Sequence, residues 1–372
     1  MQSFYNTFIE KLKKQYPSAP VVKEHLLNCV SPFTIEIPAS AFSKMETAVK
    51  TIYQWSRENL PLDKPEIAKV KIKNESVLMA YDFHLDEENN PRLIEINTNA
   101  SGFLVTDLIQ KSHGIQTKAL ELLRESFFKE WHLFSNSSTP PSYTAIVDEN
   151  IDMQKMKFEF FMYHDLMNNW GWNTKVLDVK NLKINQKDKL IDPGHIEIDF
   201  IYNRLTDFYL KKFSLLKQAY EQQTSCFSPN PKEYSILAYK KNLCLLYEDS
   251  KISADNLLQQ ILIPSELLDA RKDAWENKKT LFFKPIESYG GGGSYRGKSI
   301  TKKKFSELEN YIVQEYIPPQ TWKDPINQDQ WKFDIRAYVY QDQIQLLGGR
   351  IYKGQVTNFQ NPLGGFCLVH TK

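Results

Sequence analysis

Four consecutive glycines, Gly290, Gly291, Gly292 and Gly293, stand in the segment LFFKPIESYGGGGSYRGKSIT. A run of glycines is costly in backbone entropy, so we expect it where the backbone must come close to a ligand. Successive backbone N–H groups in such a loop can face an anion, and phosphate is the usual one. Lys284 ends the apolar strand before the loop and could reach phosphates that the loop covers. This favours a phosphate site over the alternative, a flexible surface loop.

Residues Gly292 to Ser299 also satisfy the pattern G-x-x-x-x-G-K-[ST] of a P-loop. A P-loop needs a buried strand that runs directly into the loop and a helix that begins at the lysine. Here the strand ends at Pro285, well before the match, and no apolar run ending in Asp follows it. We therefore expect a loop that covers phosphates as a flap, and not a P-loop.

The segment YIVQEYI, residues 311–317, predicts an apolar strand that leads into a polar turn. Backbone groups in such a turn can bind the edge of an adenine ring. We expect Glu315, Tyr316 and Ile317 to supply those groups.

Two carboxylates and an amide form a second group of candidate residues. Glu95 and Asn97 are two apart on one predicted strand, so their side chains point to the same face. Asp82 lies on the preceding strand of the same predicted hairpin, across the turn EENNP. Three oxygen ligands on one sheet face suit Mg²⁺, which shares its coordination with nucleotide phosphates. A polar strip that faces solvent is the alternative, although the apolar residues around Glu95 argue against it.

A third group lies in the segment FDIRAYVYQDQIQLLGGRIYKGQVTNFQNPLGGF. Asp334 and Arg336 share one face of a predicted strand, Arg350 ends the next strand, and Asn358 follows in a loop closed by glycines. An arginine in such a position can stabilise a phosphate or a developing oxyanion. An ordinary Asp–Arg pair on the surface is the alternative. The occurrence of all three groups in one chain favours the functional interpretation.

The helices and strands that must position these residues are predicted from the spacing of the apolar residues. Residues 1–60 are predicted to be helical, with Ser40 as the N-cap of the second helix, and residues 105–134 are helical again. Residues 76–100 form the hairpin that carries the carboxylates.

Strands and a helix alternate between two polar, proline-rich joints, residues 137–142 and 227–234. TAIVD is a strand, MKFEFFMYHDLMNNWG is a helix closed by Gly171, and NTKVLDV and IEIDFIYNRL are strands, which together predict a small parallel sheet. The fold class is therefore mixed, α+β. The predicted domains are residues 1–136 with the E-x-N segment, the α/β residues 137–230, and the nucleotide-binding residues 231–372.

The composition predicts a soluble chain, because 41% hydrophobic and 25% charged residues among 372 are sufficient for more than one packed unit. A formal net charge of +2 gives no reason to expect a nucleic-acid partner. The four cysteines are far apart and form no CxxC pair, so neither a zinc ribbon nor a disulfide scaffold is expected. No apolar run is long enough for a membrane span, and we expect a cytoplasmic protein.

The three groups together resemble the ATP-grasp superfamily, whose members usually join a carboxylate to an amine through an acylphosphate. The stretch from YIVQEYI through DIRAYVY to TNFQNPLGGF looks like that of the ribosomal-protein glutamate ligase group. In those enzymes the metal-binding E-x-N follows the D-x-R strand, whereas here LIEINTNASGF precedes it. That order is similar to circularly permuted members, eukaryotic-type glutathione synthetase and glutathionylspermidine synthetase.

The resemblance implies a circularly permuted ATP-grasp fold, with antiparallel sheets, helices and a small inserted parallel α/β domain. It implies ATP and Mg²⁺ as cofactors, with Asp82, Glu95 and Asn97 as metal ligands. The residues implied to contact the nucleotide are Lys240 (or its neighbour Lys241), Lys284, Gly290 to Gly293, and Glu315 to Ile317. The catalytic residues would be Arg336, Arg350 and Asn358, the last two at the γ-phosphate and acylphosphate.

Two positions depart from the permuted synthetases. Those enzymes have an arginine two residues before the aspartate, where this chain has Ala80, and Arg350 is a candidate to supply the missing charge. They also place a metal-binding glutamate directly before the glycines, and Glu287 is only an approximate substitute.

We therefore expect an ATP-dependent carboxylate–amine ligase. Amino acids, peptides and polyamines are candidate substrates, and Arg204, after the strand IDFIY, is a candidate anchor for a substrate carboxylate. An ATP-grasp small-molecule kinase is one alternative, and a non-catalytic ATP-binding protein, which Ala80 favours, is another. A homodimer is compatible with the sequence.

Overall fold

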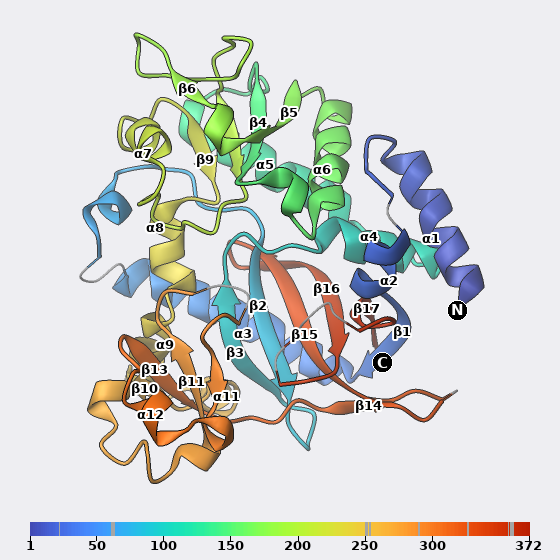
Figure 1. The fold of residues 1–372 in the computed structure, drawn as a ribbon, viewed down its shortest axis with the longest axis vertical. Helices are drawn as coiled ribbons and strands as arrows, with labels where there is room; N and C mark the ends of the chain where they lie inside the picture. Colours follow the sequence, from blue (N-terminus) through green and yellow to red (C-terminus); the bar gives the residue numbers. More distant parts are fainter. Residues whose placement is uncertain are drawn as a thin grey trace.

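The computed structural model describes residues 1–21, 23–60, 64–249, 252, 254–288, 291–325, 327–355, 357 and 361–372. A seven-stranded sheet lies at the centre, with a four-stranded antiparallel sheet below it and a four-stranded parallel sheet above it in the view of Figure 1. The fold is therefore mixed α and β, as the sequence predicts.

The central sheet has the order β1-β17-β16-β15-β2-β3, and β14 pairs with β15. Only the β1–β17 pair is parallel among its described pairs. Its strands, in chain order, are β1 (Val30–Ile37), β2 (Met79–Leu85), β3 (Pro91–Asn97), β14 (Thr321–Lys323), β15 (Gln330–Tyr340), β16 (Gln343–Tyr352) and β17 (Gly365–Thr371). The first and last parts of the chain thus build one sheet.

The two smaller sheets flank the central one. The antiparallel sheet consists, in spatial order, of β10 (Ser265–Leu267), β13 (Tyr311–Glu315), β11 (Leu281–Pro285) and β12 (Tyr295–Arg296). The parallel sheet consists of β5 (Thr174–Asp178), β4 (Thr144–Asp148), β8 (Phe200–Asn203) and β9 (Cys226–Ser228). A separate two-stranded pair is formed by β6 (Lys183–Ile184) and β7 (Leu190–Ile191).

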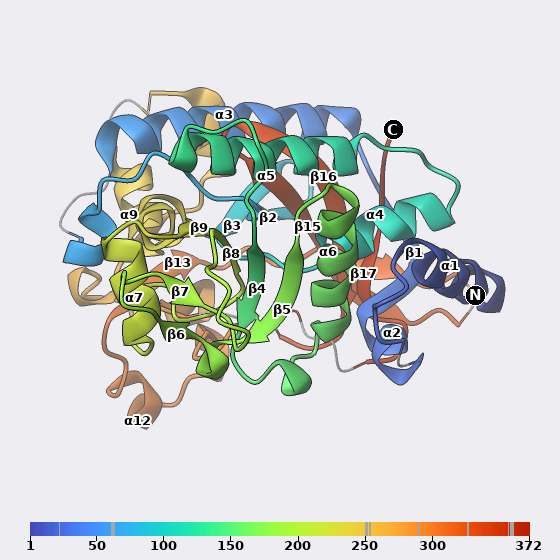
Figure 2. The same ribbon diagram turned by 90° about the horizontal axis from the view of Figure 1, so that it is seen from above.

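Helices cover the sheets. The two long helices α3 (Ala39–Asn59) and α5 (Ala119–Ser135) both contact β16 and lie along one side of the molecule in Figure 2. The remaining α-helices are α1 (Gln2–Gln15), α2 (Lys23–Cys29), α4 (Phe103–Ser112), α6 (Lys157–Asn169), α7 (Ser214–Glu221), α8 (Pro231–Glu233), α9 (Lys241–Glu248), α11 (Asn256–Ile261) and α12 (Lys302–Phe305). No helix among the described residues is long and apolar enough to cross a membrane.

Local hydrogen bonds close the turn of the β2–β3 hairpin. The carboxylate of Asp86 accepts from the backbone N–H groups of Glu88 (3.0 Å) and Asn90 (2.8 Å), which is an Asx-type turn. Asn89 has a left-handed backbone with φ of 62°, a conformation that asparagine tolerates. The predicted hairpin is confirmed.

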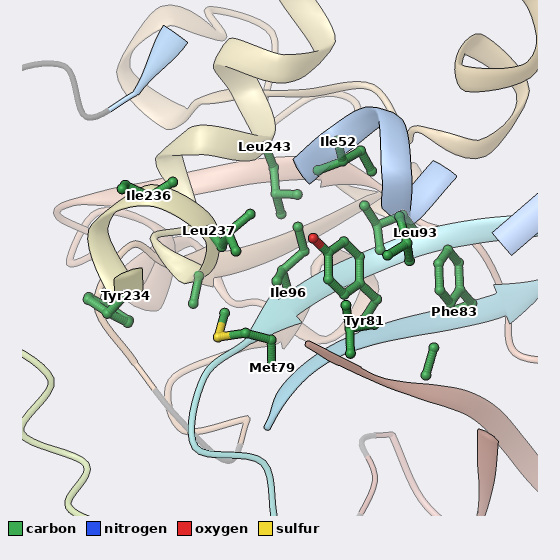
Figure 3. Close-up of a cluster of buried hydrophobic side chains, with 14 of the residues drawn as sticks. Ile52, Met79, Tyr81, Phe83, Leu93, Ile96, Tyr234, Ile236, Leu237 and Leu243 are labelled. Atoms are coloured by element: carbon green, nitrogen blue, oxygen red, sulfur yellow. The ribbon is translucent and has the colours of Figure 1, made fainter. Parts of the chain in front are cut away.

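The hairpin places its apolar side chains on one face and the candidate site on the other. Figure 3 shows Met79, Tyr81 and Phe83 of β2 packed toward α3 and toward the π-helical turn Tyr234–Ala238. Because successive strand residues alternate between faces, Asp82 projects to the opposite side. The buried core therefore holds in place the strands that carry the site.

The N-terminal prediction was partly wrong. Residues 30–37 form the strand β1, whose alternating burial follows Phe33, Ile35 and Ile37, and not a helix. Helix α3 begins after Pro38, which caps it without a side-chain hydrogen bond, so the predicted N-cap role of Ser40 is wrong. The long predicted helix is split between α4 and α5 at Gly114, whose φ of +79° ends the first of them.

The predicted parallel sheet is confirmed, and Gly171 follows α6 with a φ of +85°. Phe227 and Ser228, at the start of the second predicted joint, belong to β9, the fourth strand of that sheet. All four cysteines are buried and free. The domain boundaries themselves stay a prediction.

Candidate active site

One cavity of about 710 Å³ collects residues from all three predicted groups. It lies where the central sheet, the antiparallel sheet and the segment after β3 meet. The predicted residues that line it are Asp82, Glu95, Asn97, Lys284, Gly291, Glu315, Tyr316, Ile317, Asp334, Arg336 and Arg350. Side chains separated by more than two hundred positions in the sequence thus share one site.

Strand pairing assembles a cluster of two carboxylates and two guanidinium groups at the base of the cavity. Arg336 of β15 is opposite Asp82 of β2, and Arg350 of β16 is opposite Asp334 of β15. Arg336 donates to Asp82 through both Nε and Nη2, at 2.8 Å each. Arg350 joins the two carboxylates, with Nη2 2.9 Å from Asp82 Oδ2 and Nε 2.6 Å from Asp334 Oδ1.

The electrostatics of this cluster keep Asp82 ionised. Burial alone would raise the pKa of Asp82, but the positive charges of Arg336 and Arg350 outweigh it and lower that pKa below its usual range. Both oxygens of Asp82 already accept from guanidinium groups. The structure thus places Asp82 as the anion that orients two arginines, and its role as a metal ligand stays a prediction.

Ala80, the position that departs from the permuted synthetases, is fully buried and pairs with Asn97 and Tyr338 in the sheet. The charge missing there is present nearby, since two arginines bind Asp82. The suggestion that Arg350 supplies this charge therefore has a geometric basis, and Arg336 contributes as well.

Glu95 and Asn97 leave oxygen atoms available beside the cluster. The Asn97 amide nitrogen donates to Asp82 Oδ2 (2.9 Å) and Glu95 Oε1 (3.1 Å). Among the described residues, neither Asn97 Oδ1 nor Glu95 Oε2 accepts a hydrogen bond. Burial raises the pKa of Glu95, but the charges of Lys240 and Lys284 outweigh it and lower the pKa. Glu95 is therefore ionised at neutral pH.

The donor set around Glu95 fits a cation of the Mg²⁺ type, which prefers carboxylate and carbonyl oxygens. One member of this donor set, Asn97, is an amide. In the described part of the chain, no group of three or more His, Cys, Asp or Glu side chains could hold a metal ion. The assignment of Glu95 and Asn97 as metal ligands stays a prediction.

Two buried lysines face the same region. Among the described residues no carboxylate lies within ion-pair distance of either, although both interact electrostatically with Glu95. Lys284, only 4% exposed, donates to the backbone oxygen of Ile94 (2.7 Å) and to Gln314 Oε1 (2.8 Å). Burial lowers the pKa of Lys284 to about 8. Lys240 donates to the backbone oxygen of Ser288 at 2.8 Å, just before the glycines. Lys240, and not Lys241, is thus the lysine held against the loop.

The glycine loop has the backbone conformation that requires glycine. Gly291 and Gly293 both have φ of +71°, in the left-handed region. A Cβ atom on Gly293 would lie 3.0 Å from Pro285 Cγ and 3.1 Å from the Tyr311 hydroxyl. That hydroxyl donates to the carbonyl oxygen of Gly293 at 2.9 Å. Gly290, part of the predicted loop, lies outside the described residues.

The structure excludes a P-loop at Gly292–Ser299. Tyr295 and Arg296 form β12, which pairs antiparallel with β11. Gly297–Ser299 is a single 3-10 turn, and the four-residue α12 begins only at Lys302. Lys298 is exposed. The loop therefore connects two paired strands and does not open a helix.

The predicted hinge follows β13 and lines the cavity. The N–H of Tyr316 donates to the carbonyl oxygen of Thr280 at 2.8 Å. The carbonyl oxygen of Ile317 accepts from His84 Nδ1 at 2.8 Å, so this histidine nitrogen carries its hydrogen. Burial lowers the pKa of His84, which keeps the ring neutral. The N–H of Ile317 has no acceptor within the described ranges.

The predicted Lys240, Gly292 and Gly293 are not among the residues that line this cavity. Three further predicted residues lie away from it or outside the described residues. Arg204 is buried and donates to Ser101 Oγ (2.5 Å) and to the Tyr202 hydroxyl (3.0 Å), so it reaches the cavity only through Ser101. Glu287 lines a different, adjoining cavity. Asn358 lies outside the described residues, while its neighbour Thr357 donates to Asp334 Oδ2 at 2.6 Å. The anchoring role of Arg204 stays a prediction.

Sequence reasoning missed several lining residues. Thr98, Ser101 and Lys155 line the cavity. Ser101 follows the E-x-N segment closely, which was the one signal that could have indicated it. The loop position of Lys155 carries no comparable signal.

Residues 209–359 match the tubulin-tyrosine ligase family. No curated protein sequence matches the chain. Among solved structures, a glutathione synthetase-like effector from Globodera pallida is similar with a TM-score of 0.61 and 10% identity, over 100% of this chain and 96% of that one. A putative gamma-glutamylcysteine synthetase from Methylobacillus flagellatus is similar with a TM-score of 0.48 and 9% identity, over 86% and 83% of the two chains. The ATP-grasp ligase PsnB is similar with a TM-score of 0.27 and 11% identity, over 61% and 87%.

The similarity to the effector over the full chain shows an ATP-grasp fold of the glutathione synthetase kind. The family match covers the antiparallel sheet, the glycine loop and both arginines of the cluster. Together they support an ATP-dependent ligase at this coarse level.

Proposed function

We propose that this chain, which has an ATP-grasp fold, is an ATP-dependent ligase that joins a carboxylate to an amine through an acylphosphate. The observation that carries the proposal is the single cavity in which Lys284, the hinge residues, Glu95 and the two arginines meet. A volume of about 710 Å³ is in the range of sites that hold a nucleotide-sized ligand.

The lining of the cavity contains groups that would suit the different parts of ATP. The hinge at Tyr316 and Ile317 would take the adenine edge, with the N–H of Ile317, which has no acceptor among the described residues, as a donor. Lys284 and the backbone of Gly291 would contact the phosphates, for which their charge and N–H groups are suited. The γ-phosphate would then lie toward Arg336 and Arg350, where a transferred charge is stabilised.

Glu95 and Asn97 would hold Mg²⁺ with their free oxygens. When bound, the ion would neutralise part of the triphosphate charge. The ionised state of Glu95 and its position between the lysines and the guanidinium groups support this assignment.

The proposed reaction has two balanced steps. A carboxylate oxygen attacks the γ-phosphorus of ATP, which forms an acylphosphate and releases ADP. An amine nitrogen then attacks the acyl carbon, phosphate leaves, and the nitrogen loses a proton as the amide forms. Arg336 and Arg350 need only remain in place during both steps, since Asp82 and Asp334 already orient them.

Trapping with hydroxylamine tests this proposal without knowledge of the amine substrate. The protein is incubated with ATP, Mg²⁺, hydroxylamine and pools of carboxylic acids, including amino acids and short peptides, and ADP and hydroxamates are measured. The proposal predicts carboxylate-dependent ADP in excess of enzyme and a hydroxamate product. Lys298→Met, on the exposed turn, is the matched control for Lys284→Met, and only the second should abolish turnover.

Two other results would contradict the proposal. ADP release that needs no amine and yields a phosphorylated hydroxyl group would show a kinase. An absence of ADP beyond the amount of enzyme, in protein that binds nucleotide, would show a non-catalytic ATP-binding protein.

A further inference from the structure

Two side-chain hydrogen bonds tie the hinge segment to the β2–β3 hairpin. His84 Nδ1 donates to the carbonyl oxygen of Ile317 at 2.8 Å. Three residues further on, Gln320 Nε2 donates to the carbonyl oxygen of Asp86 at 2.6 Å. The hairpin that carries the candidate metal ligands therefore also holds the segment that would take the base of the nucleotide.

The hinge has few backbone groups that a ligand could use. The N–H of Tyr316 already donates to a backbone carbonyl, and Pro318 and Pro319 have no N–H. The N–H of Ile317 has no acceptor in the part of the chain that the structure describes, while its carbonyl oxygen accepts from His84. Ile317 lines the cavity and thus offers a donor there, with its acceptor already engaged.

His84 is well placed to fix that carbonyl, because it lies on a strand and not on a loop. Its neighbours Phe83 and Leu85 are buried on the other face of β2. A carbonyl oxygen can only accept, so the Nδ1 of His84 is the donor. His84 and Ile317 both line the cavity, so their hydrogen bond belongs to its wall. The central sheet therefore sets the position of a hinge group that follows the antiparallel sheet.

The two purine bases differ in what they bring to such a hinge. The N1 atom of adenine is an acceptor, whereas N1 of guanine carries a hydrogen and is a donor. Adenine N1 can accept from the N–H of Ile317, but the N1–H of guanine would need a carbonyl oxygen in its place. A buried donor that finds no acceptor is costly, so a site whose groups match one base rejects the other.

We propose that His84 is a positioning residue that sets the base preference of the nucleotide site. By holding the carbonyl oxygen of Ile317, it leaves only the N–H of that residue for the base, which favours adenine over guanine. His84 acts through Ile317 and need not touch the nucleotide. This inference rests on the proposed function and deepens it, since it assigns the nucleotide specificity of that site to a residue outside the hinge.

Calorimetric titration of the full chain with Mg²⁺ and non-hydrolysable analogues of ATP and GTP measures this preference as the ratio of two dissociation constants. The unmodified chain should prefer the ATP analogue. His84→Leu frees the carbonyl oxygen of Ile317 and should reduce the ratio by about tenfold, the effect of one hydrogen bond. His84→Asn, whose amide nitrogen can take the place of Nδ1, should restore most of the ratio. The matched control is Gln320→Leu, which removes the other tie of the hinge but leaves the Ile317 carbonyl engaged, so the ratio should not change.

Several results would overturn the role of His84. Equal binding of the two analogues by the unmodified chain, or an unchanged ratio in His84→Leu, would show that the engaged carbonyl does not select the base. The same fall of the ratio in Gln320→Leu would show a general loosening of the hinge, and the same fall in His84→Asn would assign the effect to the volume of the ring. An absence of ATP-analogue binding to the folded, unmodified chain would reject the proposed function, whereas these other results would reject only the inference about His84.

Discussion

The guanidinium cluster on the central sheet and the lysines beside the glycine loop are both buried and cationic, yet they are built differently. Arg336 and Arg350 are fully paired with Asp82 and Asp334 through ion pairs of 2.6–2.9 Å. Lys284 donates only to a backbone carbonyl and an amide oxygen, and among the described residues no carboxylate lies within ion-pair distance of it.

The difference indicates two separate tasks. A buried charge without a partner is unfavourable unless a ligand supplies the opposite charge. The lysine region has two ammonium groups and one nearby carboxylate, Glu95, so an anionic ligand should add to its stability, while the arginine cluster is already ion-paired. Changes in the cluster should mainly reduce stability, and changes at Lys284 should mainly reduce ligand binding.

The largest effect is expected for Arg350→Met. The substitution leaves Asp334 and Asp82 buried with fewer partners, which typically costs about 3–5 kcal/mol of unfolding free energy. Urea denaturation measures this loss, with the exposed Arg124→Met as the control, for which a change below about 1 kcal/mol is expected. Equal stability of the two variants would mean that the cluster does not hold the sheet together.

Lys284→Met should show the opposite pattern. A charged hydrogen bond to phosphate is lost, so the affinity for a non-hydrolysable ATP analogue should fall by about 10- to 100-fold. The unfolding free energy should change less than in Arg350→Met, because Lys284 is hydrogen-bonded to neutral oxygens and makes no ion pair among the described residues. A large loss of stability without loss of affinity would remove the distinction between the two regions.

The pH dependence follows from the pKa of Lys284, about 8 in the folded chain. Phosphate binds the protonated ammonium, so analogue affinity should decrease as pH rises above about 8, with proton uptake on binding. For folding the sign is reversed: between about pH 8 and the normal lysine pKa the unfolded chain binds more protons, so this residue makes stability increase with pH. Calorimetry in buffers of different ionisation enthalpy measures the uptake, and Lys284→Met should abolish it.

The smallest effect is expected for Gly293→Ala. A side chain at φ of +71° is strained, and the new Cβ would press on Pro285 and Tyr311. We expect a loss of about 1 kcal/mol in unfolding free energy. Thermal denaturation checks this, and a stabilised variant would show that the loop does not need a left-handed residue there.

Much of the local structure could be predicted from the sequence. The β2–β3 hairpin was evident from its turn residues, and the shared face of Glu95 and Asn97 followed from strand periodicity. The strand β1 and the break at Gly114 were missed because short periodic signals in an otherwise helical region are weak.

The partners of Asp82 could not be predicted. They depend on the pairing of β2 with β15, more than two hundred residues away, which places Arg336 directly opposite. Without knowledge of that strand register, the sequence suggests only that Asp82, a carboxylate near Glu95, is a metal ligand. The prediction that the three groups meet in one cavity rested on the family resemblance, because the local sequence pattern does not show which strands are neighbours.

Calorimetric titration of a non-hydrolysable ATP analogue, with and without Mg²⁺, tests whether the cavity binds ATP through Lys284 and Glu95. We predict one Mg²⁺-dependent site, weakened in Lys284→Met and in Glu95→Gln and unchanged in Lys298→Met. An absence of binding to folded protein, or binding lost only in Lys298→Met, would contradict it.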